Sequence, residues 1–166
     1  KNNQGIIGII DIPSYNSKIE PSKPYLILDN ITDPGNMGTI LRTADWFGVK
    51  NIIISPDSVD PYNSKVLRSA MGAHFHINQI IQNSLLNTIT KLKKENFTIL
   101  GADLNGISLA ELTIPDKWGL ILGSEAHGIS NEIDNLIDKK ITIPKLGSID
   151  SLNVSVASGI ILNHLT

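Results

Sequence analysis

The chain contains no cysteine, which excludes disulfide bonds and thiolate chemistry and makes a cytoplasmic location the default expectation. Aromatic residues make up only 5% of its 166 residues. No apolar run approaches the roughly eighteen residues that a membrane helix needs, so we expect no membrane partner. The net charge of −2 shows no excess of basic groups. A disulfide-rich secreted domain and a membrane-spanning protein are therefore both poor descriptions of this sequence.

The composition that is present, 41% hydrophobic and 18% charged, is typical of a folded globular domain rather than a disordered chain. A chain of this length fits one domain and can bury a sizeable core. Nucleic-acid-binding proteins usually have a basic surface, and this chain has none by composition. A nucleic-acid partner would therefore require basic residues gathered on one face, or affinity supplied by another domain.

Short runs rich in Ile, Leu and Val recur along the chain, and they are nearly continuous rather than alternating. Such runs are typical of strands buried on both faces of a parallel sheet. We predict strands over residues 6–10, 25–28, 51–54, 97–102, 120–122 and 141–143. Between them, apolar spacing predicts helices over residues 37–47, 64–71, 85–95, 131–137 and 152–165. The alternation predicts an α/β fold with a mostly parallel sheet flanked by helices.

The first polar segment, Asp33-Pro-Gly-Asn36, is a turn that leads into the helix expected from residue 37. Pro and Gly are turn residues, and Asn36 is well suited to capping the helix. These structural roles explain residues 33–36. They do not explain Arg42, which lies off the apolar stripe of the helix that follows. An exposed, solvated side chain is the ordinary outcome for such an arginine.

The second segment, Gly123-Ser-Glu-Ala-His-Gly128, directly follows a predicted buried strand. Open α/β sheets bind ligands beyond the carboxyl ends of their strands, and glycines allow the backbone to approach a ligand closely. The segment lacks the Lys-Ser/Thr of a phosphate-binding loop, and no Gly-x-Gly-x-x-Gly follows any strand. A nucleoside triphosphate or dinucleotide site is therefore poorly supported.

The third segment, residues 143–157, is polar and rich in Gly and Ser, yet it leads directly into an apolar helical run. Ser151 in front of an apolar helix has a simple interpretation as its cap. Capping does not account for Asn153, because Asn is a modest helix former and is found mainly at helix ends. A turn that presents Ser151 and Asn153 at the mouth of a helix indicates a site for a polar ligand.

Together these segments resemble the three ordered motifs of the SpoU (TrmH-like) family, knotted enzymes that methylate RNA ribose. The resemblance rests on the spacing from Asn36 to Arg42, on Gly-Ser-Glu followed by a glycine, and on Ile-Pro followed by Ser-Leu-Asn-Val-Ser-x-Ala. It implies S-adenosylmethionine as cofactor and the ribose 2'-hydroxyl of ribosomal or transfer RNA as the methylated group. The catalytic residues that it implies are Arg42, Asn36, Glu125, Ser151 and Asn153. The cofactor contacts that it implies are Leu122, Gly123, Ser124, Ile143, Leu152 and Asn153.

The resemblance also implies a deep trefoil knot near the C-terminus, a homodimer, and a domain order in which residues 1–24 are a strand and linker after a missing RNA-binding domain. Residues 25–166 then form the methyltransferase domain. The small residues at 69–73 resemble a segment near the active site of family members, and Arg68 could meet RNA phosphate. His74 and His76 would share a face of a strand over residues 73–77. They lack a third ligand, so we expect no metal.

Three alternatives remain open. The first is a protein of the same fold that has lost catalysis and serves as an RNA-binding or assembly factor. Retention of all five implied catalytic residues argues against it. The second is a flavodoxin-like nucleotide binder, although residues 33–38 make a poor phosphate loop. The third is methylation of a base by a related knotted enzyme, against which the Ser-Leu-Asn segment favours ribose.

Overall fold

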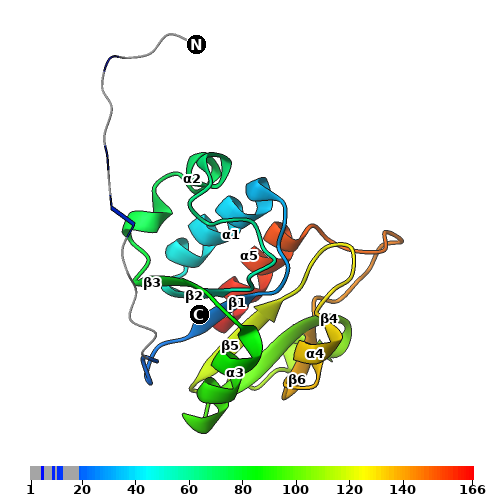
Figure 1. The fold of residues 1–166 in the computed structure, drawn as a ribbon. Helices are drawn as coiled ribbons and strands as arrows, with labels where there is room; N and C mark the ends of the chain where they lie inside the picture. The colour runs from blue at the N-terminus through cyan, green and yellow to red at the C-terminus, as the bar shows by residue number, and fades with distance from the viewer. Residues whose placement is uncertain (1–4, 6–8, 10, 13–18) are drawn as a thin grey trace.

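The computed structural model describes residues 5, 9, 11–12 and 19–166. The strand expected over residues 6–10 therefore lies outside the described residues except at Ile9, as does most of the expected linker before residue 19. None of the helices in the described part of the chain is long and apolar enough to cross a membrane. The elements from Tyr25 onward contain the sheet and both of its hydrophobic layers (Figure 1).

The core of the protein is a six-stranded sheet with the strand order β3-β2-β1-β5-β4-β6. Every pairing in it is parallel, which confirms the predicted α/β fold. The strands are β1 (Tyr25–Leu28), β2 (Asn51–Ile54), β3 (Gln79–Gln82), β4 (Thr98–Ser108), β5 (Trp118–Leu122) and β6 (Lys139–Thr142). The central strands β1, β2 and β5 are buried along their whole length, as continuous apolar runs require.

Two layers of helices cover the sheet. Alternate residues of each strand face opposite layers, so Leu26 and Leu28 belong to one hydrophobic cluster, whereas Tyr25 and Ile27 belong to the other. The first cluster includes α1 (Pro34–Trp46), α2 (Ser64–Ala70) and α5 (Val154–Leu165). The second includes α3 (Leu85–Lys94) and α4 (Asn131–Asp134) (Figure 1).

The sequence-based assignment is wrong in the region of residues 71–82. Residues 73–77 form no strand: Ala73–Phe75 is a short 3-10 helix, η1, in which His74 is buried, and His76 beyond it is exposed. The strand of this region is β3, which was not predicted because its four residues begin and end with glutamine. It is an edge strand, where full apolarity is not needed. The helices α4 and α5 are also shorter than expected, and α5 begins at Val154 rather than at residue 152.

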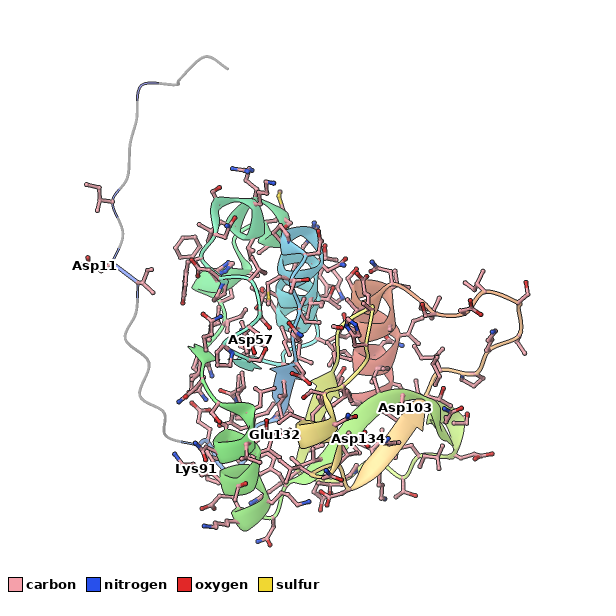
Figure 2. The ribbon with its side chains drawn as sticks, turned by 45° about the vertical axis from the view of Figure 1, so that its right-hand side comes forward. Asp11, Asp57, Lys91, Asp103, Glu132 and Asp134 are labelled. Carbon is pink, nitrogen blue, oxygen red and sulfur yellow. The ribbon has the colours of Figure 1, made fainter. Side chains whose placement is uncertain are left out.

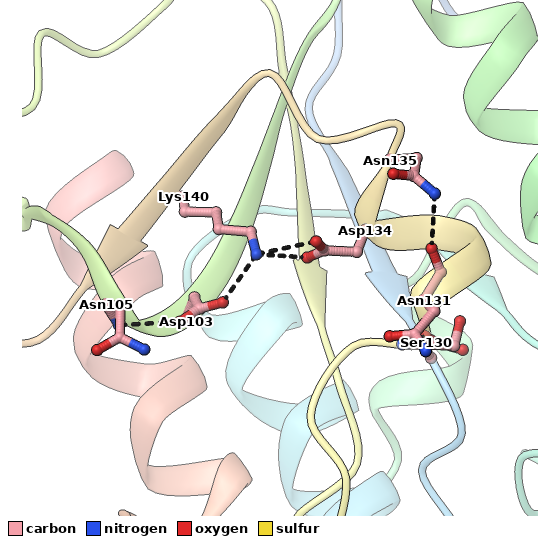
Figure 3. A network of polar contacts seen from close by, with 8 residues as sticks. Asp103, Asn105, Ser130, Asn131, Asp134, Asn135 and Lys140 are labelled. Carbon is pink, nitrogen blue, oxygen red and sulfur yellow. Dashed lines mark hydrogen bonds and ion pairs between the residues drawn. The ribbon is translucent and has the colours of Figure 1, made fainter.

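A polar network fastens the other edge of the sheet. The pairing of β4 with β6 is interrupted by a bulge after Ala102, where Asp103 lies beside Lys140 of β6. The Lys140 Nζ contacts Asp103 at 3.1 Å and Asp134 of α4 at 2.7 Å (Figure 3). The backbone N–H of Asn105, and then Lys140, hold the pKa of Asp103 below its usual value, and bonds to both carboxylates raise the pKa of Lys140. The network joins β4, β6 and α4.

After β6 the chain runs through residues 143–153 without regular structure. It leaves the sheet edge, extends away from the body of the molecule, and returns to begin α5, which packs against α1 (Figure 1). Residues 144–153 are exposed, and Leu146 and Ile149 are exposed even though they are apolar. The segment that carries the third motif is thus the least packed part of the described fold after residue 24.

Candidate functional site

The loops at the carboxyl edge of the sheet enclose a cavity of about 260 Å³. The β1–α1 loop, the β5–α4 loop and the start of α5 form its walls, so all three sequence motifs contribute. The lining residues are Asn30, Ile31, Thr32, Asp33, Asn36, Ser124, Glu125, Ala126, His127 and Val154. This is the position at which an open parallel sheet is expected to bind a ligand.

Three predicted site residues meet directly beside this cavity. The Nδ2 of Asn36 donates to Oε1 of Glu125 at 2.9 Å, and the Nδ2 of Asn153 donates to the same oxygen at 2.7 Å. Asn153 also donates to Oδ1 of Asn36 at 3.0 Å. The second carboxylate oxygen, Oε2, has no hydrogen-bond partner among the described residues. We refer to Asn36, Glu125 and Asn153 as the amide–carboxylate cluster.

Asn36 reaches this cluster because the first turn of α1 is capped by another residue. The helix cap is Asp33, whose Oδ1 accepts the backbone N–H of Asn36 at 2.7 Å. The expectation that Asn36 caps the helix is therefore wrong. Asp33 takes the capping role, Pro34 occupies the first helical position, and the amide of Asn36 is free to face the β5–α4 loop.

Asn153 both caps a helix and completes the cluster. Its Oδ1 accepts the backbone N–H of Ser155 at 2.9 Å and so caps α5, which corrects the expectation that Ser151 caps this helix. With its oxygen turned toward the helix, the Nδ2 of Asn153 points to Glu125. An amide has both a donor and an acceptor, whereas a carboxylate cap has no donor to offer Glu125.

The loop that carries Glu125 is tightly folded. Ser124 and Gly128 exchange two backbone hydrogen bonds of 2.9 Å, and Gly128 has a φ of +69°. A Cβ at Gly123 would lie 2.2 Å from the backbone carbon of Gly128, so only glycine fits there. The backbone of this loop is therefore fixed before any ligand arrives.

The β1–α1 loop supplies site features that the motifs did not reveal. Asn30 has a φ of +58°, and the backbone N–H groups of Asn30 and Ile31 donate to the hydroxyls of Ser55 and Ser58. Asp29 is buried at the end of β1 and accepts the Ser130 backbone N–H at 2.7 Å. It thereby joins two walls of the cavity. Its position directly after an apolar strand is a signal from which it could have been found.

The remaining predicted residues lie outside the cluster. Arg42 is exposed, six residues along α1 from Asn36, and makes no polar contact with the described part of the chain. Ser151 and Leu152 are exposed in the loop before α5, and Ile143 is half-buried against the core. Leu122 is buried, and its carbonyl accepts the N–H of Asp29. Neither the cavity nor the cluster contains Arg42, Ser151, Leu152 or Ile143.

The cavity has the features that a polar, hydroxyl- and amine-bearing cofactor needs. Its walls are two backbone loops fixed by internal hydrogen bonds, and an unengaged carboxylate oxygen of Glu125 is available to accept a donor. A metal site receives no such support: within the described residues, no group of three or more His, Cys, Asp or Glu side chains is placed to hold an ion.

Comparison with known proteins identifies the family. The profile of the SpoU rRNA Methylase family matches residues 23–163. The chain is 34% identical over 163 residues to the 23S rRNA (guanosine(2553)-2'-O)-methyltransferase RlmP of Bacillus subtilis. It is 35% identical over 169 residues to the 23S rRNA (guanosine-2'-O-)-methyltransferase RlmB of Neisseria meningitidis. The matches cover 98% and 97% of this chain but 64% and 68% of these relatives, so the chain spans about two thirds of their length.

The fold gives the same result. An AdoMet-bound rRNA methyltransferase from Sinorhizobium meliloti superposes with a TM-score of 0.83 at 30% identity, covering 90% of this chain and 58% of that one. The deep knot expected from the sequence is implied by this likeness. The sequence match over nearly the whole chain, the shared fold and the three motifs that meet at one cavity lead to one conclusion: the chain belongs to the SpoU rRNA methylase family.

Proposed function

We propose that the chain transfers a methyl group from S-adenosylmethionine to a ribose 2'-hydroxyl of ribosomal RNA. The observation that carries the proposal is the amide–carboxylate cluster, which joins one residue from each of the three motifs beside the cavity. Relatives that span nearly the whole chain are named as guanosine 2'-O-methyltransferases of 23S rRNA. Their names support ribose over base methylation, and they give no support to an inactive RNA-binding protein.

The cofactor supplies an electrophilic methyl group, so no protein nucleophile is required. The bond from methyl carbon to sulfur breaks as the bond to the ribose oxygen forms, and the hydroxyl proton must leave. The protein has to align the reacting atoms and exclude water. In this scheme the Gly123–Gly128 loop would hold the cofactor, and Ile143 and Leu152 would have to approach it from outside the cavity. A phosphate oxygen, Ser151 or water accepts the proton.

Asn153 offers the first test. We expect S-adenosylhomocysteine to bind this chain saturably in a calorimetric titration, and Asn153→Ala to weaken that binding at least about tenfold. The variant removes two hydrogen bonds of the cluster and the cap of α5. The matched control is Asn135→Ala directly after α4, where the amide donates only to the Asn131 carbonyl. If the folded wild-type chain binds no S-adenosylhomocysteine, the proposed function is wrong for this chain.

Arg42 is proposed to act on the RNA rather than on the cofactor. Its guanidinium stays protonated in proteins, so it is suited to orienting the hydroxyl and stabilising a developing alkoxide or a nearby phosphate. We expect Arg42→Ala to lower methylation of a 23S rRNA transcript about 100-fold or more while leaving S-adenosylhomocysteine affinity within about twofold. Equal loss of both would show that Arg42 is structural.

A homodimer is part of the proposal, and the exposed apolar face of α1 and α5 supports it. Val156 and Ile160, one turn apart on α5, are 51% and 40% exposed, and Trp46 on α1 is 84% exposed. The two helices pack side by side, with Gly159 of α5 close to Thr43 of α1. The last helix is therefore buried on one face only. An apolar patch of this kind marks a protein interface.

The dimer is tested by sedimentation. We expect the wild-type chain to sediment as a dimer and Ile160→Glu to sediment as a monomer, because a carboxylate would be buried without a partner in the interface. Leu104→Glu on β4, where the leucine is 68% exposed, is the control and should not change the mass. A monomeric wild-type chain would contradict the proposal. The cytoplasmic location and the role of residues 1–24 stay predictions.

A further inference from the structure

A second exposed apolar group lies on α2 and the short helix that follows it. Met71, at the end of α2, is 72% exposed, and Phe75 in η1 is 73% exposed. Two cations, Lys65 and Arg68, are exposed on α2 itself. We refer to Lys65, Arg68, Met71 and Phe75 as the α2 face. None of these residues belongs to the cavity or to the proposed dimer surface.

The α2 face is connected directly to the start of α1, where the candidate site begins. The hydroxyl of Ser69 donates to the carbonyl of Pro34, the residue after Asp33 in the cavity wall. The helices touch so closely that a Cβ at Gly38 would lie 1.9 Å from the Ser69 Oγ. Figure 1 shows α2 next to α1, and both helices pack on the same layer of the sheet. The start of α1, which borders the cavity, therefore lies directly against α2.

The backbone beneath the face has two successive residues in the left-handed conformation. Met71 adopts a left-handed conformation, with a φ of +51°, which side chains other than Gly, Asn and Asp rarely adopt. Gly72 follows with a φ of +92°, and a Cβ on it would lie 4.0 Å from Cδ2 of Phe75. His74 is buried between these residues and bonds to the Pro61 carbonyl at 2.7 Å. An exposed methionine is thus kept at a position that a glycine would occupy without strain.

The two charged side chains of α2 itself are both positive. Lys65 and Arg68 are the only charged residues of the helix, and both are exposed. The acidic residue that precedes the helix, Asp60, accepts the backbone N–H of Tyr62. Asp103, Glu132 and Asp134 lie around β4, α4 and β6, away from α2 (Figure 2). Two copies of this face would repel each other, which disfavours a second copy of the chain as its occupant.

We propose that an unpaired segment of the RNA substrate lies across the α2 face, with one base stacked on Phe75 and Met71 and its phosphates near Lys65 and Arg68. Exposed aromatic rings beside cations are the feature by which proteins hold single-stranded nucleic acid, because every base has a face that can stack. The inference rests on the proposed function and adds a substrate class to it: RNA that is single-stranded beside the methylated ribose.

The experiment measures fluorescence anisotropy of the chain with a fluorescein-labelled single-stranded RNA of twelve mixed nucleotides and with the same strand in a duplex. We expect the single strand to bind more tightly. Phe75→Leu should weaken it about 5- to 100-fold, whereas Phe75→Trp should retain it, because only the ring is at issue. Met71→Gly suits the left-handed backbone, so it removes the side chain without straining the fold and should also weaken binding.

Two controls separate stacking from general effects. Arg68→Gln should reduce the slope of log affinity against log salt by about 0.7, the value for one phosphate contact with a single strand. Leu104→Ala, at an exposed apolar residue on the opposite part of the sheet, should change neither quantity. Equal affinity of Phe75→Leu and wild type for the single strand would overturn the proposal, as would a change in sedimentation caused by Phe75→Leu.

Titration with S-adenosylhomocysteine distinguishes this inference from the proposed function. In one outcome, the wild-type chain binds S-adenosylhomocysteine and methylates RNA while Phe75→Leu leaves the KM for RNA unchanged. That result would show that the proposal for the α2 face is wrong and that the proposed function stands. A chain that binds no cofactor product would reject the proposed function, whatever its affinity for RNA. Support for the inference requires that Phe75→Leu raise KM for RNA while its affinity for S-adenosylhomocysteine stays within about twofold of wild type.

Discussion

The two ends of the same parallel sheet both carry polar side chains, but they use them differently. At the amino end, Tyr25, Asn51 and Gln79 are buried and bond to one another, with the Gln79 amide donating to both partners. The space beside them is only about 20 Å³, enough for little more than a water molecule. At the carboxyl end, the amide–carboxylate cluster is exposed, lies beside a cavity of about 260 Å³ and retains an unengaged oxygen.

The difference shows what distinguishes a site from a structural network. Polar residues at the end of a strand are not informative by themselves, because a buried network satisfies its own donors and acceptors and stabilises the fold. A binding site needs bonding capacity that the protein does not use, together with space around it. We therefore expect substitutions at the carboxyl end to change ligand affinity, and substitutions at the amino end to change the stability of the fold.

The largest effect on ligand affinity is expected from a substitution that crowds the loop at the carboxyl end of the sheet. Gly123→Ala would place a methyl group 2.2 Å from the Gly128 backbone, so the loop that carries Glu125 must shift. We expect loss of saturable S-adenosylhomocysteine binding, by more than about 100-fold, while the chain remains folded by circular dichroism.

The control for this variant is Gly159→Ala within α5, where the new methyl group would meet Thr43 at an ordinary 3.7 Å. It should bind S-adenosylhomocysteine like wild type, and alanine in a helix should stabilise the fold by up to about 1 kcal/mol. Undiminished binding by Gly123→Ala would show that the tight loop does not form the cofactor site.

At the amino end we expect the opposite response. Tyr25→Phe removes the hydroxyl that accepts the Glu20 backbone N–H at 2.7 Å and the Gln79 amide at 3.2 Å. The free energy of unfolding in urea should fall by about 1–2 kcal/mol, because buried donors lose an acceptor. Affinity for S-adenosylhomocysteine should stay unchanged. A variant of full stability with weakened binding would reverse the roles assigned to the two ends.

The smallest effect concerns His74, a buried group that lines neither of the two spaces described above. Its Nδ1 has no partner among the described residues, and burial lowers the pKa of His74 below its ordinary value of about 6.5. The unfolded chain therefore binds more protons below pH 6.5 than the native chain does. The contribution of this residue to stability is accordingly lost as pH falls below that value.

The measurement is urea unfolding of wild type and His74→Gln between pH 7.5 and 5.5. The glutamine amide retains a donor for the Pro61 carbonyl but does not titrate. The stability of wild type relative to the variant should decline on acidification, with a slope of at most about 1.4 kcal/mol per pH unit. A difference that is constant with pH would show that His74 is protonated as readily in the folded chain as in the unfolded one.

The sequence predicted those parts of the molecule in which local pattern and tertiary demand agree. The strands β1, β2 and β5 are continuous apolar runs because both faces of the sheet are covered, so their pattern identified them. Strand β3 escaped prediction because an edge strand needs less burial, and its glutamines serve the amino-end network and the β2–α2 loop.

The site was predictable in its residues but not in its geometry. The motifs indicated Asn36, Glu125 and Asn153, yet only the fold shows that their side chains share one carboxylate oxygen. The choice of helix cap depends on tertiary context. Asp33 rather than Asn36 caps α1, because Asn36 is needed in the cluster. Asn153 rather than Ser151 caps α5, and Ser151 is left exposed. No local pattern distinguishes these possibilities, since Asp, Asn and Ser are all good caps.

The two roles of Asn153 have a consequence for the order of events during synthesis. Its partner Asn36 lies 117 residues earlier, so the cluster depends on a contact between distant parts of the chain, and such contacts form slowly. The carbonyl that caps α5 belongs to the same amide that bonds Glu125, so docking of the last helix and completion of the site are a single step. A nascent chain that has not yet released residues 154–165 from the ribosome has the two loop walls of the cavity but lacks Val154 and a complete cluster. Under the proposed function, the enzyme would remain inert toward RNA until α5 has docked against α1.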